Sequence, residues 1–177
     1  MRPPGWSYNP SDWSQRVPIA GLSLLGFAIA LYLALYQWGV IPEVWEPFFG
    51  DGSRRILHSW VSKLFPIPDA ALGAFAYLLD AATAVVGGRR RWKTMPWMVM
   101  LFGIAVGPMG VVGIVLIVIQ PLLFDAWCTL CILSAGISLA MIYPSLDEVV
   151  ASWQFVRREV RQGRPFWQTL LKGTADS

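Results

Sequence analysis

"TMPWMVMLFGIAVGPMGVVGIVLIVIQPLLF", residues 94–124, is a run of 31 residues without a charge, bounded by Lys93 and Asp125. A helix needs about 20 apolar residues to cross the hydrocarbon core of a bilayer, so this run is long enough to span a membrane. Two further uncharged runs, 17–42 and 126–146, are also long enough, and a fourth candidate, 68–88, has the right length but includes Asp69 at its start and Asp80 inside. The pattern predicts an all-α polytopic membrane protein, built as a bundle of four transmembrane helices.

The composition agrees with a lipid environment. The chain has 177 residues, of which 55% are hydrophobic and ten are Trp, and its mean hydropathy is +0.51. This is more apolar surface than a soluble domain of that size can bury. The first run, 17–42, is too long for a cleavable signal peptide and follows a polar arm, so we expect it to remain as an anchor.

The basic residues predict the orientation. Eleven of the 14 Lys and Arg lie before residue 17, between the second and third runs, or after residue 146, and only Arg54, Arg55 and Lys63 lie in the 43–66 segment. By the positive-inside rule, both termini are cytoplasmic and the 43–66 segment faces outward. The expected location is the inner (cytoplasmic) membrane. Topology accounts for most of the basic residues, so the net charge of +3 indicates no nucleic-acid partner.

Three parts follow from this topology. Residues 1–16 form a cytoplasmic arm, residues 17–146 form the four-helix membrane domain, and residues 147–177 form a cytoplasmic tail that we expect to be loosely ordered from Gly163. Within the 43–66 segment, "SRRILHSWVSKLF" carries apolar residues at helical spacing. It predicts a short outer half-helix on the membrane surface, capped by Ser53 and ended by Pro66 and Pro68.

The only two cysteines, Cys128 and Cys131, lie at the expected outer end of the last helix. A spacing of three places both sulfurs on one helical face. With Asp125 as N-cap, Cys128 falls in the first turn, where free N–H groups and the helix dipole favour the reactive thiolate. Cys131 lies about 4.5 Å deeper. We therefore expect Cys128 to meet a partner from outside and Cys131 to meet a lipid-soluble molecule.

Other interpretations of the pair are weaker. A structural zinc site needs four Cys or His ligands, and the chain offers two Cys and one distant His58, so no metal is expected. Covalent haem needs His directly after the second Cys, where Ile132 stands. Two cysteines that merely pack as small apolar residues remain an alternative.

Two stretches carry a family resemblance. "WCTLC" is followed by Ser134, and "ILHSWVSKLFPIPDAALGAFAY" occupies residues 56–77. In these motifs and in the order of its spans, the chain resembles bacterial members of the vitamin K epoxide reductase family. The resemblance implies a thiol–disulfide oxidoreductase that couples its cysteine pair to a quinone of the ubiquinone or menaquinone type. It implies that Cys131 faces the quinone, that Cys128 exchanges disulfides, and that Ser59 and Asp69 contact the quinone.

The sequence departs from the family at the outer loop. Family members usually carry a second cysteine pair there, but here Ser53 stands before the half-helix and the 43–66 segment contains no Cys. Ala135 replaces a tyrosine of some animal members, which argues against vitamin K epoxide as substrate.

These departures leave several interpretations open. A separate thioredoxin-like soluble protein on the outer side could reduce the pair directly, or small molecules could oxidise and reduce it. The pair could also merely hold the fold. In the last case the protein is a non-catalytic quinone- or lipid-binding membrane subunit or scaffold.

Further polar and aromatic residues have less specific interpretations. Asp80 is the one acid well inside a run, where it could serve a proton route or reach Arg89 or Arg90 near the inner end. His58 could exchange a proton beside a quinone, although a surface position is the simpler interpretation. Four aromatic residues could wall a quinone pocket or simply mark the membrane interface. They are Trp60, Phe65, Phe124 and Trp127.

Overall fold

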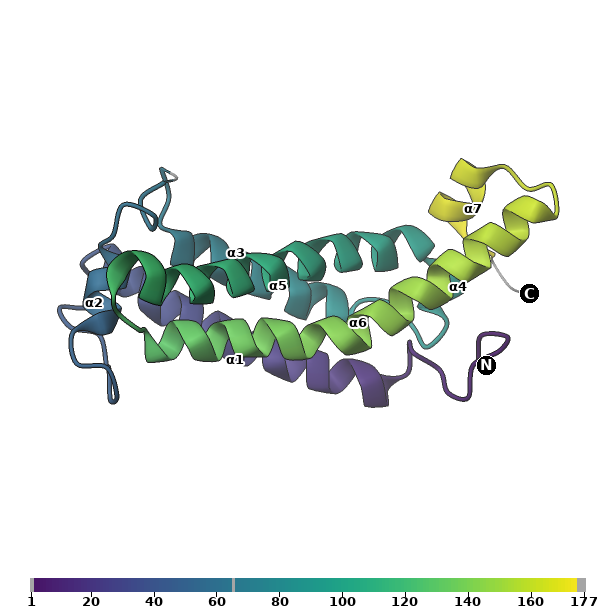
Figure 1. Ribbon diagram of the computed structural model, residues 1–177. Coiled ribbons are helices and arrows are strands. Elements are labelled where there is room, and N and C mark those ends of the chain that lie inside the picture. The colour runs from purple at the N-terminus through teal and green to yellow at the C-terminus, as the bar shows by residue number, and fades with distance from the viewer. Residues whose placement is uncertain (1, 65, 175–177) are drawn as a thin grey trace.

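The computed structural model describes residues 2–64 and 66–174, and within these residues all regular structure is helical. The helices are α1 Trp13–Gln37, α2 Gly52–Leu57, α3 Asp69–Val85, α4 Arg91–Thr94, α5 Pro96–Phe124, α6 Thr129–Arg161 and α7 Phe166–Lys172. Figure 1 shows α1, α3, α5 and α6 running along one bundle, with α2 at one end and both termini at the other.

Among the described residues, three helices are long and apolar enough to cross a membrane, namely α1, α5 and α6. Their lipid-facing apolar side chains imply contact with a bilayer. Helix α3 is apolar but has only 17 residues, and it packs alongside α1. The expected all-α membrane architecture is therefore present, with three clear candidate spans and one shorter helix in the bundle.

Glycines let these helices approach closely. A Cβ on Gly26 of α1 would lie 2.5 Å from the ring of Tyr77 on α3. Between α5 and α6, Gly110 faces Ile142 in the same manner. Small residues at helix interfaces are a common packing device in membranes, where lipid provides no hydrophobic drive for association.

Helix α1 begins earlier than the uncharged run predicts, and it includes Arg16. The guanidinium is fully buried and donates to the carbonyls of Ala84, Val86 and Gly87, at 2.7–2.8 Å. These carbonyls lie in and just after the last turn of α3, at the negative end of its helix dipole, and Arg91 donates to two of them as well. The charge therefore lies inside the helix because it is neutralised locally.

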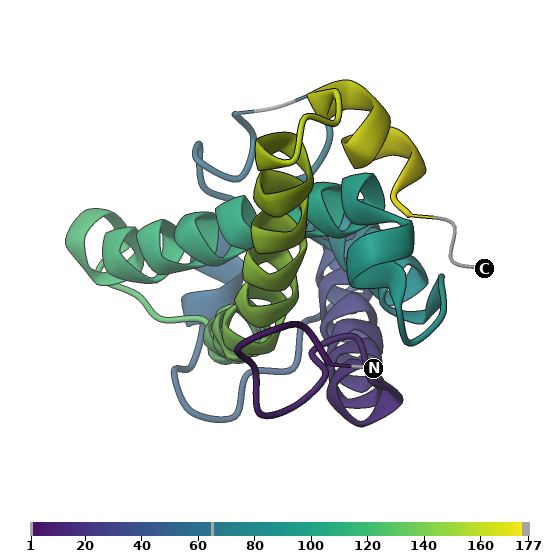
Figure 2. The same ribbon diagram turned by 90° about the vertical axis from the view of Figure 1, so that its right-hand side faces the viewer.

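Helix α6 extends 15 residues past the predicted end of the last run at Leu146 and stops at Arg161. The tail is also more ordered than expected, because α7 folds back beside α6, as the view in Figure 2 shows. The Thr174 backbone nitrogen donates to the Lys93 carbonyl at 3.0 Å and ties this tail to α4.

The predicted half-helix is much shorter than its pattern. Helix α2 has six residues, and Asp51 rather than Ser53 occupies its N-cap position. After Leu57 the chain continues as turns, because the Ser62 hydroxyl donates to the carbonyls of Leu57 and Ser59, at 2.8 and 2.9 Å. Such side-chain bonds to nearby carbonyls compete with helix continuation.

Candidate active site

Cys128 and Cys131 form a disulfide, with their Cα atoms 5.2 Å apart. Asp125 is not the N-cap of α6; it ends α5 in the left-handed region, with φ of 44°. Asp tolerates this conformation better than most residues, because its short polar side chain bonds locally. Cys128 takes the N-cap position instead, and its sulfur accepts a hydrogen bond from the Cys131 backbone nitrogen at 3.1 Å.

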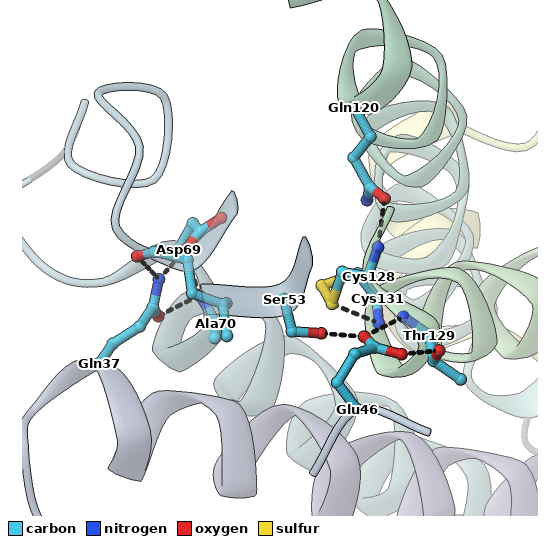
Figure 3. The surroundings of a disulfide bond; sticks show 10 residues. Gln37, Glu46, Ser53, Asp69, Ala70, Gln120, Cys128, Thr129 and Cys131 are labelled. Carbon is cyan, nitrogen blue, oxygen red and sulfur yellow. Dashed lines mark hydrogen bonds between the residues drawn. A yellow bond between two sulfur atoms is a disulfide. The ribbon is translucent and has the colours of Figure 1, made fainter. Parts of the chain in front are cut away.

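Two side chains that the sequence analysis missed hold this cysteine loop in place (Figure 3). The side-chain oxygen of Gln120, on α5, accepts from the backbone nitrogen of Cys128 at 3.1 Å. On the other side, Glu46 accepts from the backbone nitrogen of Thr129 at 2.9 Å, and also from its hydroxyl. Glu46 further accepts from the Ser53 hydroxyl, so one carboxylate joins the 43–66 segment to the start of α6.

The charge of Glu46 follows from these bonds. Burial of the carboxylate favours its neutral form, but the hydrogen bonds from Ser53 and Thr129 outweigh it and lower the pKa of Glu46 below its usual value. The carboxylate is therefore ionised at neutral pH, where it also satisfies the free N–H group of Thr129 at the positive end of α6.

The 43–66 segment covers Cys128. At Gly52 this segment lies so close to the loop before α6 that an added Cβ would clash with the Trp127 carbonyl. Leu57 packs with Leu33 and Leu130 in the apolar cluster that contains Cys128. Cys128 is consequently 0% exposed, contrary to the expectation that a partner reaches it directly from outside.

Cys131 instead lines a cavity of about 310 Å³ between the helices. Its walls are mostly aliphatic, contributed by Leu33, Leu57, Leu72, Val112, Leu116 and Ile119 among others. A volume near 300 Å³ and an apolar lining with a few polar groups are typical of small-molecule sites. Cys131, which we expect to meet a lipid-soluble molecule, is therefore the cysteine that lies at the cavity.

Ser59 and Asp69 line the same cavity as Cys131. Asp69 opens α3, and its Oδ1 accepts from Gln37 at 2.7 Å and from the Ala70 backbone nitrogen at 2.9 Å (Figure 3). Gln37 also donates to the Leu57 carbonyl at 3.2 Å, so it fixes Asp69 against the 43–66 segment.

The other candidates are placed differently. Of the four aromatic residues, Phe124 lines the cavity, whereas Trp60 is 66% and Trp127 is 36% exposed, and Phe65 lies outside the described residues. Exposed Trp at the end of a span is the usual interfacial pattern. His58 stacks against Tyr36, with ring centroids 5.3 Å apart, and does not belong to the cavity lining.

The inner end of the cavity carries a hydroxyl cluster. The Tyr77 hydroxyl donates to the Ser134 carbonyl at 2.5 Å and lies 2.6 Å from the Ser138 hydroxyl. Both serines are on α6, one and two turns beyond Cys131. The cluster joins α3 to α6 and satisfies its own polar atoms.

Asp80 is buried beyond this cluster, and one of its carboxyl oxygens has no hydrogen-bond partner among residues 2–64 and 66–174. Arg89, one expected partner, lies 3.8 Å from Asp12. The buried ion pair at this end of the bundle joins Arg91 to Glu148, and both side chains are 1% exposed. Ser11 of the N-terminal arm donates to the same Glu148 at 2.5 Å.

Comparison with known proteins identifies the family. The profile of the Vitamin K epoxide reductase family matches residues 17–146, which is well over half of the chain. Neither curated proteins nor solved structures give a significant match. The match covers the bundle from α1 to the first half of α6, including the disulfide and the cavity. The chain is therefore a member of the vitamin K epoxide reductase family, whose members are membrane thiol oxidoreductases.

Proposed function

We propose that the protein is a quinone-linked thiol–disulfide oxidoreductase. In the first half-reaction, a dithiol donor reduces the Cys128–Cys131 disulfide and itself becomes a disulfide. In the second, the two thiols give two electrons and two protons to a quinone, which becomes a quinol while the disulfide re-forms. The observation that carries the proposal is the position of Cys131, which is bonded to Cys128 and faces an apolar cavity.

The cavity suits a flat ring with polar oxygens. Its lining is aliphatic except for a few groups that include Ser59 and Asp69, which would donate to or orient the quinone oxygens, Asp69 in its protonated form. Leu72 on α3 and Val112 on α5 belong to the lining and are also 40% and 49% exposed. The cavity therefore reaches the lipid-facing surface between these helices, which gives a ubiquinone- or menaquinone-type molecule a route from the bilayer.

The topology supports the same assignment. We infer that α3 is a fourth span, since 17 helical residues rise about 26 Å and a thin hydrocarbon core is about 27 Å. With α2 as the outer half-helix, residues 17–146 form the catalytic membrane domain. Arms 1–16 and 147–177 lie in the cytoplasm, and the disulfide faces the outer side of the inner membrane.

The two sulfurs would have different partners. Cys131 is the sulfur that meets the quinone, because it lines the cavity. Cys128 is the sulfur that exchanges with a soluble thioredoxin-like dithiol protein. Since Cys128 is 0% exposed, this exchange requires the 43–66 segment to move away from α6.

The proposal is tested with full-length protein in lipid nanodiscs. Dithiothreitol and decylubiquinone are mixed with the protein, and quinone absorbance is followed against a protein-free reaction. We expect turnover in the wild type and in Leu133→Ala, a control at an exposed position of α6, and none in Cys131→Ser or Cys128→Ser. Equal rates in all four proteins would reject the enzyme.

The second candidate is a quinone- or lipid-binding subunit without turnover. The burial of Cys128 favours it, because no cysteine of the 43–66 segment can carry electrons to this sulfur. Decylubiquinone binding without dithiol-driven reduction would identify this case.

A further inference from the structure

Gln120 is a polar residue in an otherwise apolar part of α5, and its side chain is 3% exposed. Its amide has two halves with different surroundings. The oxygen accepts from the Cys128 backbone nitrogen at 3.1 Å. Because a backbone N–H can only donate, the atom facing it must be the amide oxygen, and the orientation of the side chain is fixed.

The other half of the amide faces the cavity. Gln120 belongs to the cavity lining together with Cys131, and its Nε2 donates to no acceptor within the described parts of the chain. Buried polar groups in native proteins almost always have partners, and an unpaired donor in an apolar site is costly. The free NH2 group therefore points to an acceptor atom on a molecule that occupies the cavity.

We propose that Gln120 contacts the substrate, donating a hydrogen bond from its NH2 group to a ring oxygen of the quinone while its oxygen holds Cys128. This rests on the proposed function and adds to it a residue that binds the oxygen nearest the disulfide. As the quinone takes two electrons and two protons from the thiols, negative charge develops on its oxygens before protonation is complete. A fixed N–H donor stabilises that charge more than it stabilises the neutral carbonyl.

A purely structural role makes a different prediction. If Gln120 only positions the cysteine loop, its loss changes how fast the disulfide is reduced but leaves quinone affinity unaltered. If it contacts the substrate, affinity falls even in protein that cannot turn over. Binding to the oxidised protein, without any thiol present, separates these two roles.

The test uses full-length protein in nanodiscs, with decylubiquinone and menadione as probes and tryptophan quenching as the readout. Gln120→Met keeps the length of the side chain and removes both hydrogen bonds. We expect its Kd for both probes to rise about 5-fold, the loss typical of one hydrogen bond. Leu122→Met, at a 75% exposed position of the same helix, is the matched control and should bind as the wild type does.

Gln120→Glu provides a second variant in case the Met variant does not fold. It retains an oxygen for the Cys128 N–H, but its carboxylate cannot donate to the quinone. We expect weak binding at high pH and recovery at low pH, when the protonated carboxyl group regains a donor. Infrared difference spectra of a carbonyl-labelled quinone give an independent readout. Loss of the donor in either variant should move the bound C=O stretch to higher wavenumber.

The outcomes are distinguishable. Unchanged Kd and an unchanged C=O stretch in the variants overturn the contact, even if disulfide reduction slows. In that case dithiol-driven quinone reduction by the wild type still upholds the proposed function. If the wild type binds quinone but never reduces it, the enzyme is rejected, while a raised Kd in the variants still supports the contact.

Discussion

Removal of the Glu46 carboxylate should open the covered disulfide to soluble dithiols. Glu46 accepts two hydrogen bonds from Thr129, one from the backbone and one from the hydroxyl, and these join the 43–66 segment to α6. Its bond from Ser53 lies within the segment and survives opening. Since Cys128 is fully buried, attack on its sulfur depends on the population of the open form.

The size of the effect follows from those two bonds. Hydrogen bonds to charged groups contribute about 1.5–3 kcal/mol each when well shielded, and partial exposure of Glu46 reduces this to about 1 kcal/mol each. Losing both in Glu46→Ala therefore favours opening by about 2 kcal/mol, which corresponds to roughly a 30-fold larger open population. We expect Glu46→Gln, which keeps an acceptor, to lie between this variant and the wild type.

The assay measures the reduction of the oxidised protein in nanodiscs by reduced thioredoxin, a dithiol too large to enter the cavity. Samples are quenched with a maleimide polymer and resolved by gel shift. Glu43→Ala is the matched control, because Glu43 is an exposed acid in the same segment. If Glu46→Ala is reduced no faster than Glu43→Ala, the segment is not the barrier and the reasoning is refuted.

The same contact predicts a pH dependence. The pKa of Glu46 is lowered in the folded protein, because the hydrogen bonds from Ser53 and Thr129 outweigh the effect of burial. Because the pKa of Glu46 is lower in the folded protein, its contact stabilises the closed form fully above the ordinary glutamate pKa of about 4.3. This stabilisation is lost as the pH falls through the pKa of Glu46 in the folded protein. The rate of reduction by thioredoxin is first corrected for the thiolate fraction of thioredoxin at each pH. The corrected rate should then increase in acid for the wild type and not for Glu46→Ala.

Three further predictions concern the bundle and its inner end. Gly26→Ala places a methyl group 2.5 Å from the Tyr77 ring and should destabilise the protein by about 1–3 kcal/mol in denaturant unfolding, whereas Gly21→Ala, with no neighbour within 4 Å, should not. Glu148→Ala leaves Arg91 buried without its counter-ion and should cost about 3–5 kcal/mol, while Arg157→Ala, at an exposed position, serves as control and should have little effect. Tyr8 donates to Asp147, and this bond, with burial and the charge of Asp147, raises the pKa of Tyr8 to about 12. The raised value means that the contact persists below the ordinary pKa of 10 and is lost as pH rises through about 12, so the ultraviolet titration of wild type minus Tyr8→Phe should show one phenol near that pH.

The positions of three candidate spans, α1, α5 and α6, could be predicted from the sequence, but the ends of the helices could not. Uncharged runs mark the hydrocarbon boundary, and α5 ends with its run at Phe124. Helix α1 instead begins before Arg16, because backbone carbonyls at the C-terminal end of α3 accept hydrogen bonds from the buried guanidinium. Helix α6 continues past Leu146, since an amphipathic helix can extend beyond the bilayer. Charge alone therefore does not end a helix when the fold provides partners for it.

The site was predictable where it depends on local spacing. The interval of three residues correctly placed Cys128 and Cys131 within bonding distance. The residues that hold them come from distant parts of the chain, which no local pattern reveals. One signal was available: runs 17–42 and 94–124 each contain a single glutamine, and these are Gln37 and Gln120. An amide in an apolar span is costly enough to indicate a specific partner.

The different surroundings of the two sulfurs limit how the proposed catalytic cycle can proceed. Cys131 lies at a cavity that reaches the lipid-facing surface, so a quinone can meet it while the 43–66 segment stays closed. Cys128 lies under that segment, so a soluble dithiol can meet it only after the Glu46 contacts to α6 break. In the proposed cycle, the thiol half-reaction is therefore gated and the quinone half-reaction is not. Under this arrangement the closed form protects the reduced pair from outside disulfides, and electrons that enter during opening leave preferentially to the quinone.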